Sequence, residues 1–398
     1  MNANTRRGSP WLIVTIALLT MVGPFTIDTY LPSFPDIEAT FGVNRTLMLQ
    51  SISFYLVASA ISTLFWGPLS DRIGRRHVIL GSSVLFVAAS VGCAWSESYS
   101  SFLFFRVVQG MAASGGMVAG RAMIRDAHDS HSAHRAMAYV MMLFAMAPAI
   151  APVIGGWLHD SWGWRSVFLF LALYGAVMIL MTLQLLPETL DPADRRSFHP
   201  AHVTRLYIST ARHPRFRALV LALGVSFAGL FTYIAGSPTV IYDFLGLDSS
   251  HFAVQFVPMT LGIVAGSFIS GRLAQRWQTP NIVWLGFLLM STACIFNLAQ
   301  SAWLTPTIFT VIAPLVVYAL GMALAIPGVT ILALDCFPEN RGTASAVQGF
   351  VQVIMAALVS SLLIPLLGAS ILGMATGQAL CLLCGLLLWA LVGSRKPA

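Results

Sequence analysis

Long apolar stretches recur from one end of this sequence to the other, and they constrain its fold more than any other feature. A helix that crosses a hydrocarbon core about 30 Å thick needs about 20 mostly apolar residues. Stretches of that length lie at residues 11–33, 46–69, 77–96, 100–123, 136–158, 164–187, 216–241, 252–275, 280–300, 305–334, 344–367 and 369–393. The sequence therefore predicts an all-α membrane protein with twelve transmembrane helices.

The composition excludes a water-soluble protein. Only 9% of the 398 residues are charged, whereas a soluble domain carries roughly 25%. With 57% hydrophobic residues the chain needs lipid as its surroundings, so the lipid bilayer is an expected partner. The basic residues lie in short segments between the apolar stretches, and this distribution argues against nucleic acid as a partner.

The basic residues also predict an orientation. If the N-terminus lies in the cytoplasm, every Lys and Arg except Arg45, Arg165 and Arg106 falls on the cytoplasmic side or in its flanks. Such a bias is typical of loops that stay on the cytoplasmic side of a membrane. We therefore expect both termini in the cytoplasm.

The chain is expected to consist of two halves. A polar linker at 188–215 separates an N-terminal six-helix bundle, residues 1–187, from a C-terminal one, residues 216–398. GPLSDR at 67–72 is echoed by GRLAQR at 271–276, and GMA at 110–112 is echoed by GMA at 321–323. Two parallel six-helix repeats with a site near their interface are a transporter architecture.

The segment between the second and third stretches has a distinctive pattern. Residues 67–76 read GPLSDRIGRR, in which glycines permit a tight turn and one carboxylate stands among several guanidiniums. This arrangement predicts a charged latch between helices. The pattern resembles the signature loop of the major facilitator superfamily.

Three further motifs support the resemblance. RVVQG at 106–110 resembles the superfamily's fourth-helix arginine motif. APAIAPVIGG at 147–156 resembles its fifth-helix antiporter motif, with alanine at two positions where glycine is usual. DTYLP at 28–32, together with GPLSDRIGRR, resembles the bicyclomycin-resistance (Bcr/CflA) family of twelve-span drug:proton antiporters.

The resemblance implies a fold of two pseudo-symmetric six-helix bundles in a bacterial inner membrane. It implies export of small amphipathic compounds or antibiotics, bicyclomycin- or chloramphenicol-like, by alternating access. Protons would be the coupling ion, with no other cofactor. We expect a monomer, although the sequence itself does not determine the oligomeric state. Some related chloramphenicol exporters carry a further acidic residue near the position of Thr20, which cannot titrate here.

The motifs assign roles to individual residues by resemblance. Asp71 is expected to meet the start of the eleventh span at Gly342 and Thr343. The gating residues are Gly67, Asp71, Arg72, Gly74, Arg75 and Asp126, and the antiporter-motif residues are Pro148, Pro152, Gly155 and Gly156.

Two ionisable residues lie inside apolar stretches, where a charge is costly and by default marks a functional site. At 1.5 Å per residue, Asp28 lies about 25 Å from Trp11, and Arg106 lies about 9 Å from Ser100. These depths match if the N-terminus is cytoplasmic. We expect Asp28 to carry the proton and Arg106 to respond to its charge. A fixed ion pair that only holds two helices together is the alternative.

Substrate contacts are expected among polar and aromatic side chains, although each of these residues is also a candidate for simple packing. The candidates are Tyr30, Tyr55, Tyr139, Met146, Phe231, Tyr233 and Gln352.

Other functions remain open within the same fold, including transport of a metabolite such as an amino acid, sugar or siderophore. The sequence does not favour a membrane enzyme, because no Cys–His pair or metal-spaced cluster that could serve in catalysis lies within the apolar stretches. Cys381 and Cys384 have no nearby ligands. His128, His131 and His134 are expected to be solvated loop residues rather than metal ligands.

Overall fold

The computed structural model describes residues 10–191, 193, 195 and 200–392, and these residues contain helices but no strands. Twelve helices are long and apolar enough to cross a membrane, which confirms the predicted all-α fold. They are Pro10–Phe41, Arg45–Ile73, Arg75–Ala94, Tyr99–Ala127, Arg135–Trp162, Trp164–Leu185, Pro214–Ala235, Ser249–Leu273, Thr279–Trp303, Ile308–Leu334, Pro338–Leu367 and Ile371–Val392.

The predicted orientation stays a prediction. Five of the basic residues on which it rests lie outside the described residues: Arg6, Arg7, Arg196, Arg395 and Lys396.

The chain divides into two compact units, Met1–Pro200 and Ala201–Ala398. This division falls inside the predicted linker at 188–215, whose limits stay a prediction. The first unit contains α2 (Pro10–Asp28), η1 (Leu31–Ser33), α3 (Phe34–Phe41), α4 (Arg45–Ile73), α5 (Arg75–Ala94), α6 (Tyr99–Ala127), α7 (Ser130–Trp162) and α8 (Trp164–Leu185).

The second unit begins within α9 (Pro200–Arg212), a helix in the predicted linker. Its other elements are α10 (Pro214–Ala235), η3 (Thr239–Phe244), η4 (Ser249–His251), α11 (Phe252–Leu273), α12 (Thr279–Trp303), α13 (Ile308–Leu334), η5 (Pro338–Asn340), α14 (Arg341–Leu358), η6 (Val359–Leu363), α15 (Ile364–Leu367) and α16 (Ile371–Val392).

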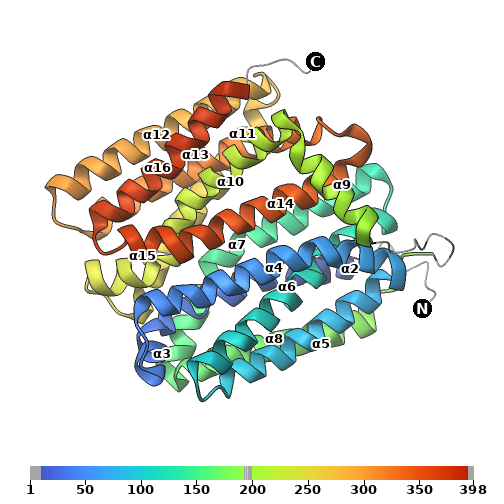
Figure 1. Ribbon diagram of the computed structural model, residues 1–398, viewed down its shortest axis with the longest axis horizontal. Coiled ribbons are helices and arrows are strands. Elements are labelled where there is room, and N and C mark those ends of the chain that lie inside the picture. The colour runs from blue at the N-terminus through green and yellow to red at the C-terminus, as the bar shows by residue number, and fades with distance from the viewer. Residues whose placement is uncertain (1–9, 192, 194, 196–199, 393–398) are drawn as a thin grey trace. The chain divides into compact units, whose positions relative to one another are not determined.

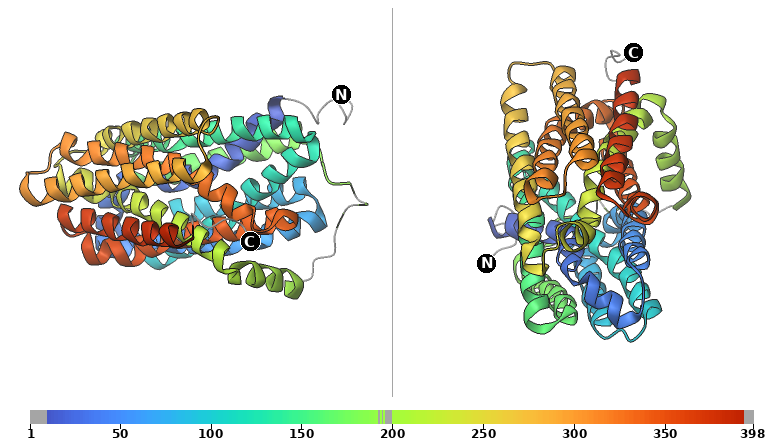
Figure 2. Two further views of the ribbon diagram at one scale, coloured as in Figure 1. Left: turned by 90° about the horizontal axis from the view of Figure 1, so that it is seen from above. Right: turned by 90° about the vertical axis from the view of Figure 1, so that its left-hand side faces the viewer.

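Equivalent helices pack together in both units. In the first unit α4 and α5 pack on α6, and α2 packs on α7; in the second, α11 and α12 pack on α13, and α10 packs on α14 (Figure 1). Within each unit the long helices run along a common direction (Figure 2). Each half therefore repeats one packing scheme, as the internal sequence repeats predict.

Several helix boundaries follow from local sequence. Asn44 caps α4 by accepting a hydrogen bond from the Leu47 amide, at 2.9 Å. Pro314 and Pro327 lie inside α13, which stays helical through both. For the span predicted at 216–241, the predicted C-terminal boundary is wrong. The helix α10 ends at Ala235, and the six-residue π-helix η3 begins at Thr239.

Small residues lie at the close contacts between helices. In lipid the hydrophobic effect does not drive helices together, so their association depends on close van der Waals packing. Gly286 of α12 and Gly321 of α13 face each other so closely that a Cβ on either would collide with the backbone of the other. In the first unit, α2, α5 and α6 enclose an apolar core that includes Ile16, Ile79 and Met123.

Candidate functional site

Arg106 of α6 lies at the centre of a buried polar cluster in the first unit, and it is 0% exposed. Its Nη1 donates to the Gln109 side-chain oxygen at 2.6 Å and to the Thr26 carbonyl oxygen at 3.3 Å. Gln109 in turn donates to the Ser90 hydroxyl of α5 at 2.8 Å. The arginine motif thus joins α5, α6 and α2. The residue that Arg106 bonds on α2, Thr26, lies two residues before Asp28 in the sequence.

Two tyrosines lie against the guanidinium. The Cζ atom of Arg106 is 4.4 Å from the centroid of the Tyr30 ring and 4.6 Å from that of Tyr55. Gly110, one turn from Arg106, makes this approach possible, because a Cβ there would collide with the backbone carbonyl of Tyr55. Tyr30 is held from its other end by a 2.8 Å hydrogen bond between its hydroxyl and that of Ser51.

Asp28 ends α2 and is 4% exposed. Among the described residues, no hydrogen bond or ion pair to its carboxylate is present, and none joins it to Arg106. The alternative of a fixed Asp28–Arg106 ion pair is therefore not found in this structure.

The antiporter motif supports the chain next to Asp28. Gly155 of α7 lies so close to the backbone of Thr29 that a Cβ would collide with the Thr29 carbonyl. Pro152 and Gly156 are buried and Pro148 is half-buried, all within an unbroken α7. The motif therefore lets α7 pack directly on the residue that follows Asp28.

Arg75 holds the latch segment together at the junction of α4 and α5. Its side chain bonds Asp126 of α6 at 3.1 Å and the Ser70 hydroxyl at 2.6 Å, and it also pairs with Asp71. Gly74 between the helices has φ of 106°, a conformation that favours glycine.

The other gating residues have fewer contacts. Gly67 approaches Val118 of α6, with 3.7 Å between the position of a Cβ and Val118 Cγ1. Arg72 is exposed. The expected contact between Asp71 and Gly342 joins the two units and stays a prediction.

Glu188 is a latch residue that the sequence reasoning missed, since it was assigned to the linker. Its carboxylate accepts hydrogen bonds from the Arg75 and Arg76 amides at 3.0 and 3.2 Å, which caps the N-terminus of α5. Arg76 reaches back to the Leu183 carbonyl at 2.7 Å. The only signal in the sequence was a carboxylate directly after the sixth apolar stretch.

A second buried polar cluster lies in the second unit and has no charged member. Asn297 of α12 donates to the Tyr233 hydroxyl at 2.8 Å and to the Gln378 side-chain oxygen at 2.9 Å. Gln255 of α11 donates to the Tyr233 backbone carbonyl at 2.6 Å. Sequence reasoning singled out Tyr233 and missed the three amides.

The structure separates the substrate candidates into groups. Tyr30 and Tyr55 pack on Arg106, and Tyr233 belongs to the amide cluster with Phe231 buried nearby in the same helix. The rest are accessible to different degrees: Tyr139 and Met146 are exposed, and Gln352 is half-buried.

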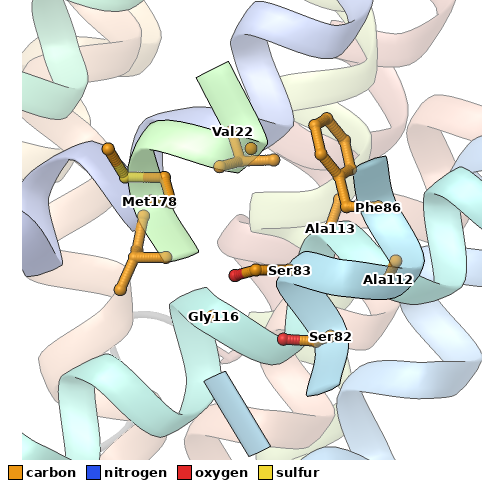
Figure 3. Close-up of a pocket in the computed structure, with 10 residues that line it drawn as sticks. Val22, Ser82, Ser83, Phe86, Ala112, Ala113, Gly116 and Met178 are labelled. Atoms are coloured by element: carbon orange, nitrogen blue, oxygen red, sulfur yellow. The ribbon is translucent and has the colours of Figure 1, made fainter. Parts of the chain in front are cut away.

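A small pocket, partly open to its surroundings, lies among α2, α5, α6 and α8 (Figure 3). Its lining is apolar except for Ser82 and Ser83, and it contains none of the predicted site residues. In the part of the chain that the structure describes, no group of His, Cys, Asp or Glu is arranged to hold a metal ion. The side chains of His131 and His134 lie outside that part.

Known proteins resemble this chain over nearly its whole length. The sequence profile of the Major Facilitator Superfamily matches residues 16–360. The chain is 28% identical to multidrug resistance protein D of Escherichia coli (strain K12), over 91% of both chains. It is 26% identical to the chloramphenicol resistance protein of Pseudomonas aeruginosa, over 90% of this chain and 86% of that one.

The crystal structure of a D-xylose-proton symporter has the same fold. It matches with a TM-score of 0.76 at 15% identity and covers 96% of this chain and 97% of that one. At this identity the likeness establishes the fold alone.

Proposed function

Since the chain belongs to the Major Facilitator Superfamily, we propose that this multi-pass membrane protein exports small amphipathic compounds in exchange for protons. Its cargo includes antibiotics similar in character to chloramphenicol or bicyclomycin. The names of its relatives, a multidrug resistance protein and a chloramphenicol resistance protein, support export of drugs. Membership of a transporter family makes the chain a transporter rather than an enzyme.

One observation carries the proton-coupling part of the proposal. Among the described charged residues, Asp28 and Arg106 alone lie more than six residues from both ends of their apolar spans. An ionisable group at such depth costs several kcal/mol, so a residue of this kind is by default a candidate functional residue. The structure brings the two to the same level of the first unit, with Arg106 bonded to the Thr26 carbonyl.

Protonation of Asp28 is the proposed coupling step. A buried carboxylate without a partner is strongly disfavoured, so binding a proton removes that penalty and shifts the balance between the two access states. One charge moved through 100 mV is worth about 2.3 kcal/mol, which sustains a substrate concentration ratio of order tens.

The Arg75 latch is the proposed gate, and its breaking would open the side on which the latch lies. Both termini lie in the cytoplasm of a bacterium in this proposal, so the latch faces the cytoplasm. The contacts from Arg75 to Asp71 and Asp126 support this role, because they hold three helix ends together.

Drug susceptibility in an efflux-deficient bacterial host, with and without a protonophore, tests the proposal. The protein is expected to protect the host, and the protonophore to remove that protection. Asp28→Asn should abolish protection while the amount of protein in the membrane is unchanged. Asp36→Asn is the matched control, because Asp36 lies in the same span but its side chain is 59% exposed.

Two results would contradict the proposal in different ways. Full protection by Asp28→Asn would exclude Asp28 as the proton site. A lack of protection against every antibiotic, together with uptake or release of one sugar, amino acid or siderophore, would instead assign a metabolite as the cargo.

A further inference from the structure

A guanidinium with no accessible surface needs compensation for the water it has lost, and an acidic side chain is its usual partner. Arg106 has no acidic partner among the described residues. It has one carbonyl, one amide oxygen and two aromatic rings. Its Nε and Nη2 atoms are buried and have no hydrogen-bond partner.

The two aromatic rings stabilise the charge of the guanidinium where hydrogen bonds do not. A guanidinium near the centroid of an aromatic ring is attracted by the ring's electron-rich face, and the attraction grows when water is excluded. Tyr30 and Tyr55 are 0% and 1% exposed, so both contacts are fully desolvated.

We propose that Tyr30 and Tyr55 are positioning residues that replace a counter-ion for Arg106, so that Asp28 stays unpaired and able to exchange its proton. This inference rests on the proposed function, in which Asp28 is the proton carrier. It differs from the substrate contact expected for both tyrosines, because it makes them act through Arg106.

We assign the effect to the two rings, although the Tyr30 hydroxyl also interacts with Arg106. The Tyr55 hydroxyl is buried and has no hydrogen bond of good geometry among the described residues, although it lies near the Thr26 side chain. The titratable groups around Arg106 are Asp28 and Tyr30 at the end of α2, Tyr55 on α4 and Cys93 on α5. Asp28 is the one carboxylic acid among them, whereas the ordinary pKa values of tyrosine and cysteine lie above neutral pH.

Without the Tyr55 ring, Arg106 is expected to recruit the Asp28 carboxylate through its open Nε–Nη2 edge. The paired carboxylate then resists protonation. In Tyr55→Leu protein, the fraction of protonated Asp28 at a fixed pH should fall by a factor of about 3 or more, the equivalent of one cation–π contact. Tyr55→Phe keeps the ring and should restore most of that fraction.

Infrared spectroscopy of the purified full-length protein in lipid measures this fraction directly. Asp28→Asn identifies the carbonyl band of protonated Asp28 by removing it. Tyr174→Leu is the control, since Tyr174 is an aromatic residue of the same unit that stacks on Phe25, at 5.4 Å between ring centroids. The band should keep its intensity in this control.

A double-mutant cycle tests whether the effect passes through Arg106. In an Arg106→Gln background, Tyr55→Leu should no longer change the band. The inference is overturned if the band is unchanged in both Tyr30→Leu and Tyr55→Leu, if Tyr174→Leu weakens it equally, or if the effect of Tyr55→Leu persists without Arg106. No substrate is present, so failure here is separate from failure of drug export, which the susceptibility panel measures.

Discussion

In the first unit the buried polar cluster contains a charged arginine and an acid, whereas the cluster of the second unit consists of amides and a phenol. The two units share one packing scheme, so the difference lies in the side chains and not in the fold. Asn297 bonds two neutral partners whose contacts do not depend on pH, while Arg106 and the unpaired Asp28 form a system whose charge can change. This contrast supports the proposed proton coupling in the first unit and indicates fixed cross-linking of helices in the second.

Removal of the buried cation is expected to have the largest effect. Arg106→Gln leaves the Thr26 carbonyl and the Gln109 side chain without their charged donor, and hydrogen bonds to charged groups contribute about 1.5–3 kcal/mol. Drug transport should fall about tenfold to hundredfold in proteoliposomes with an imposed pH gradient. Transport at the native rate would remove the distinction between the two clusters.

Disruption of the amide cluster should lower stability but leave proton coupling intact. Asn297→Leu leaves the Tyr233 hydroxyl and the Gln378 oxygen without a donor, at a cost of about 1–3 kcal/mol for each buried group. The melting temperature in detergent should fall, while the pH dependence of the remaining transport stays that of the native protein. Asn281→Leu at the start of α12 is the control, because it lies outside the cluster.

A changed pH profile in Asn297→Leu would contradict the comparison, because it would show that the neutral cluster also participates in coupling.

Neutralisation of Glu188 should weaken the latch to a smaller degree. Glu188→Gln keeps one oxygen acceptor but loses the charge that caps two amides at the start of α5, for a loss of about 0.5–2 kcal/mol. Hydrogen exchange at the Arg75 and Arg76 amides should become faster, and exchange in α12 should not change. Unchanged protection at both amides would show that the Arg75 contacts alone hold the junction.

The smallest effect is expected at Asp248, a charged residue of the second unit that lies at the surface and not in a buried cluster. Hydrogen bonds from the Ser250 hydroxyl and the His251 ring lower the pKa of this exposed carboxyl to about 2. A depressed pKa stabilises the fold above the ordinary value of about 3.9, and this contribution is lost as the pH falls towards 2. The protection of the Ser250 amide, measured as exchange relative to its intrinsic rate, should therefore fall between pH 4 and 2, and not in Asp248→Asn.

Much of the fold was predictable because the membrane imposes a simple length rule. Each span must hold about 20 apolar residues, and twelve such spans were found. Asp28 and Arg106 stood out for the same reason, since charges in apolar stretches are costly and rare. The end of α10 was not predictable, because the apolar residues Val240 and Ile241 of the π-helix extend the apolar stretch beyond it.

The partners of these residues were much harder to predict. Arg106 was expected to face Asp28, but its bonds depend on which carbonyl and which rings neighbouring helices present. The amide cluster gave no clear signal, since uncharged polar residues are common in these spans and many bond only their own helix. Thr20, for example, donates to the Ile16 carbonyl one turn earlier, at 2.8 Å.

The confinement of each polar cluster to one unit has a consequence for biosynthesis. All partners of Arg106 described here lie between Thr26 and Gln109, so they have left the ribosome before any residue of the second unit is made. The first half can thus complete its costly buried contacts during translation, while the second half is still being synthesised. Insertion errors confined to the second half are then expected to leave the arginine cluster intact.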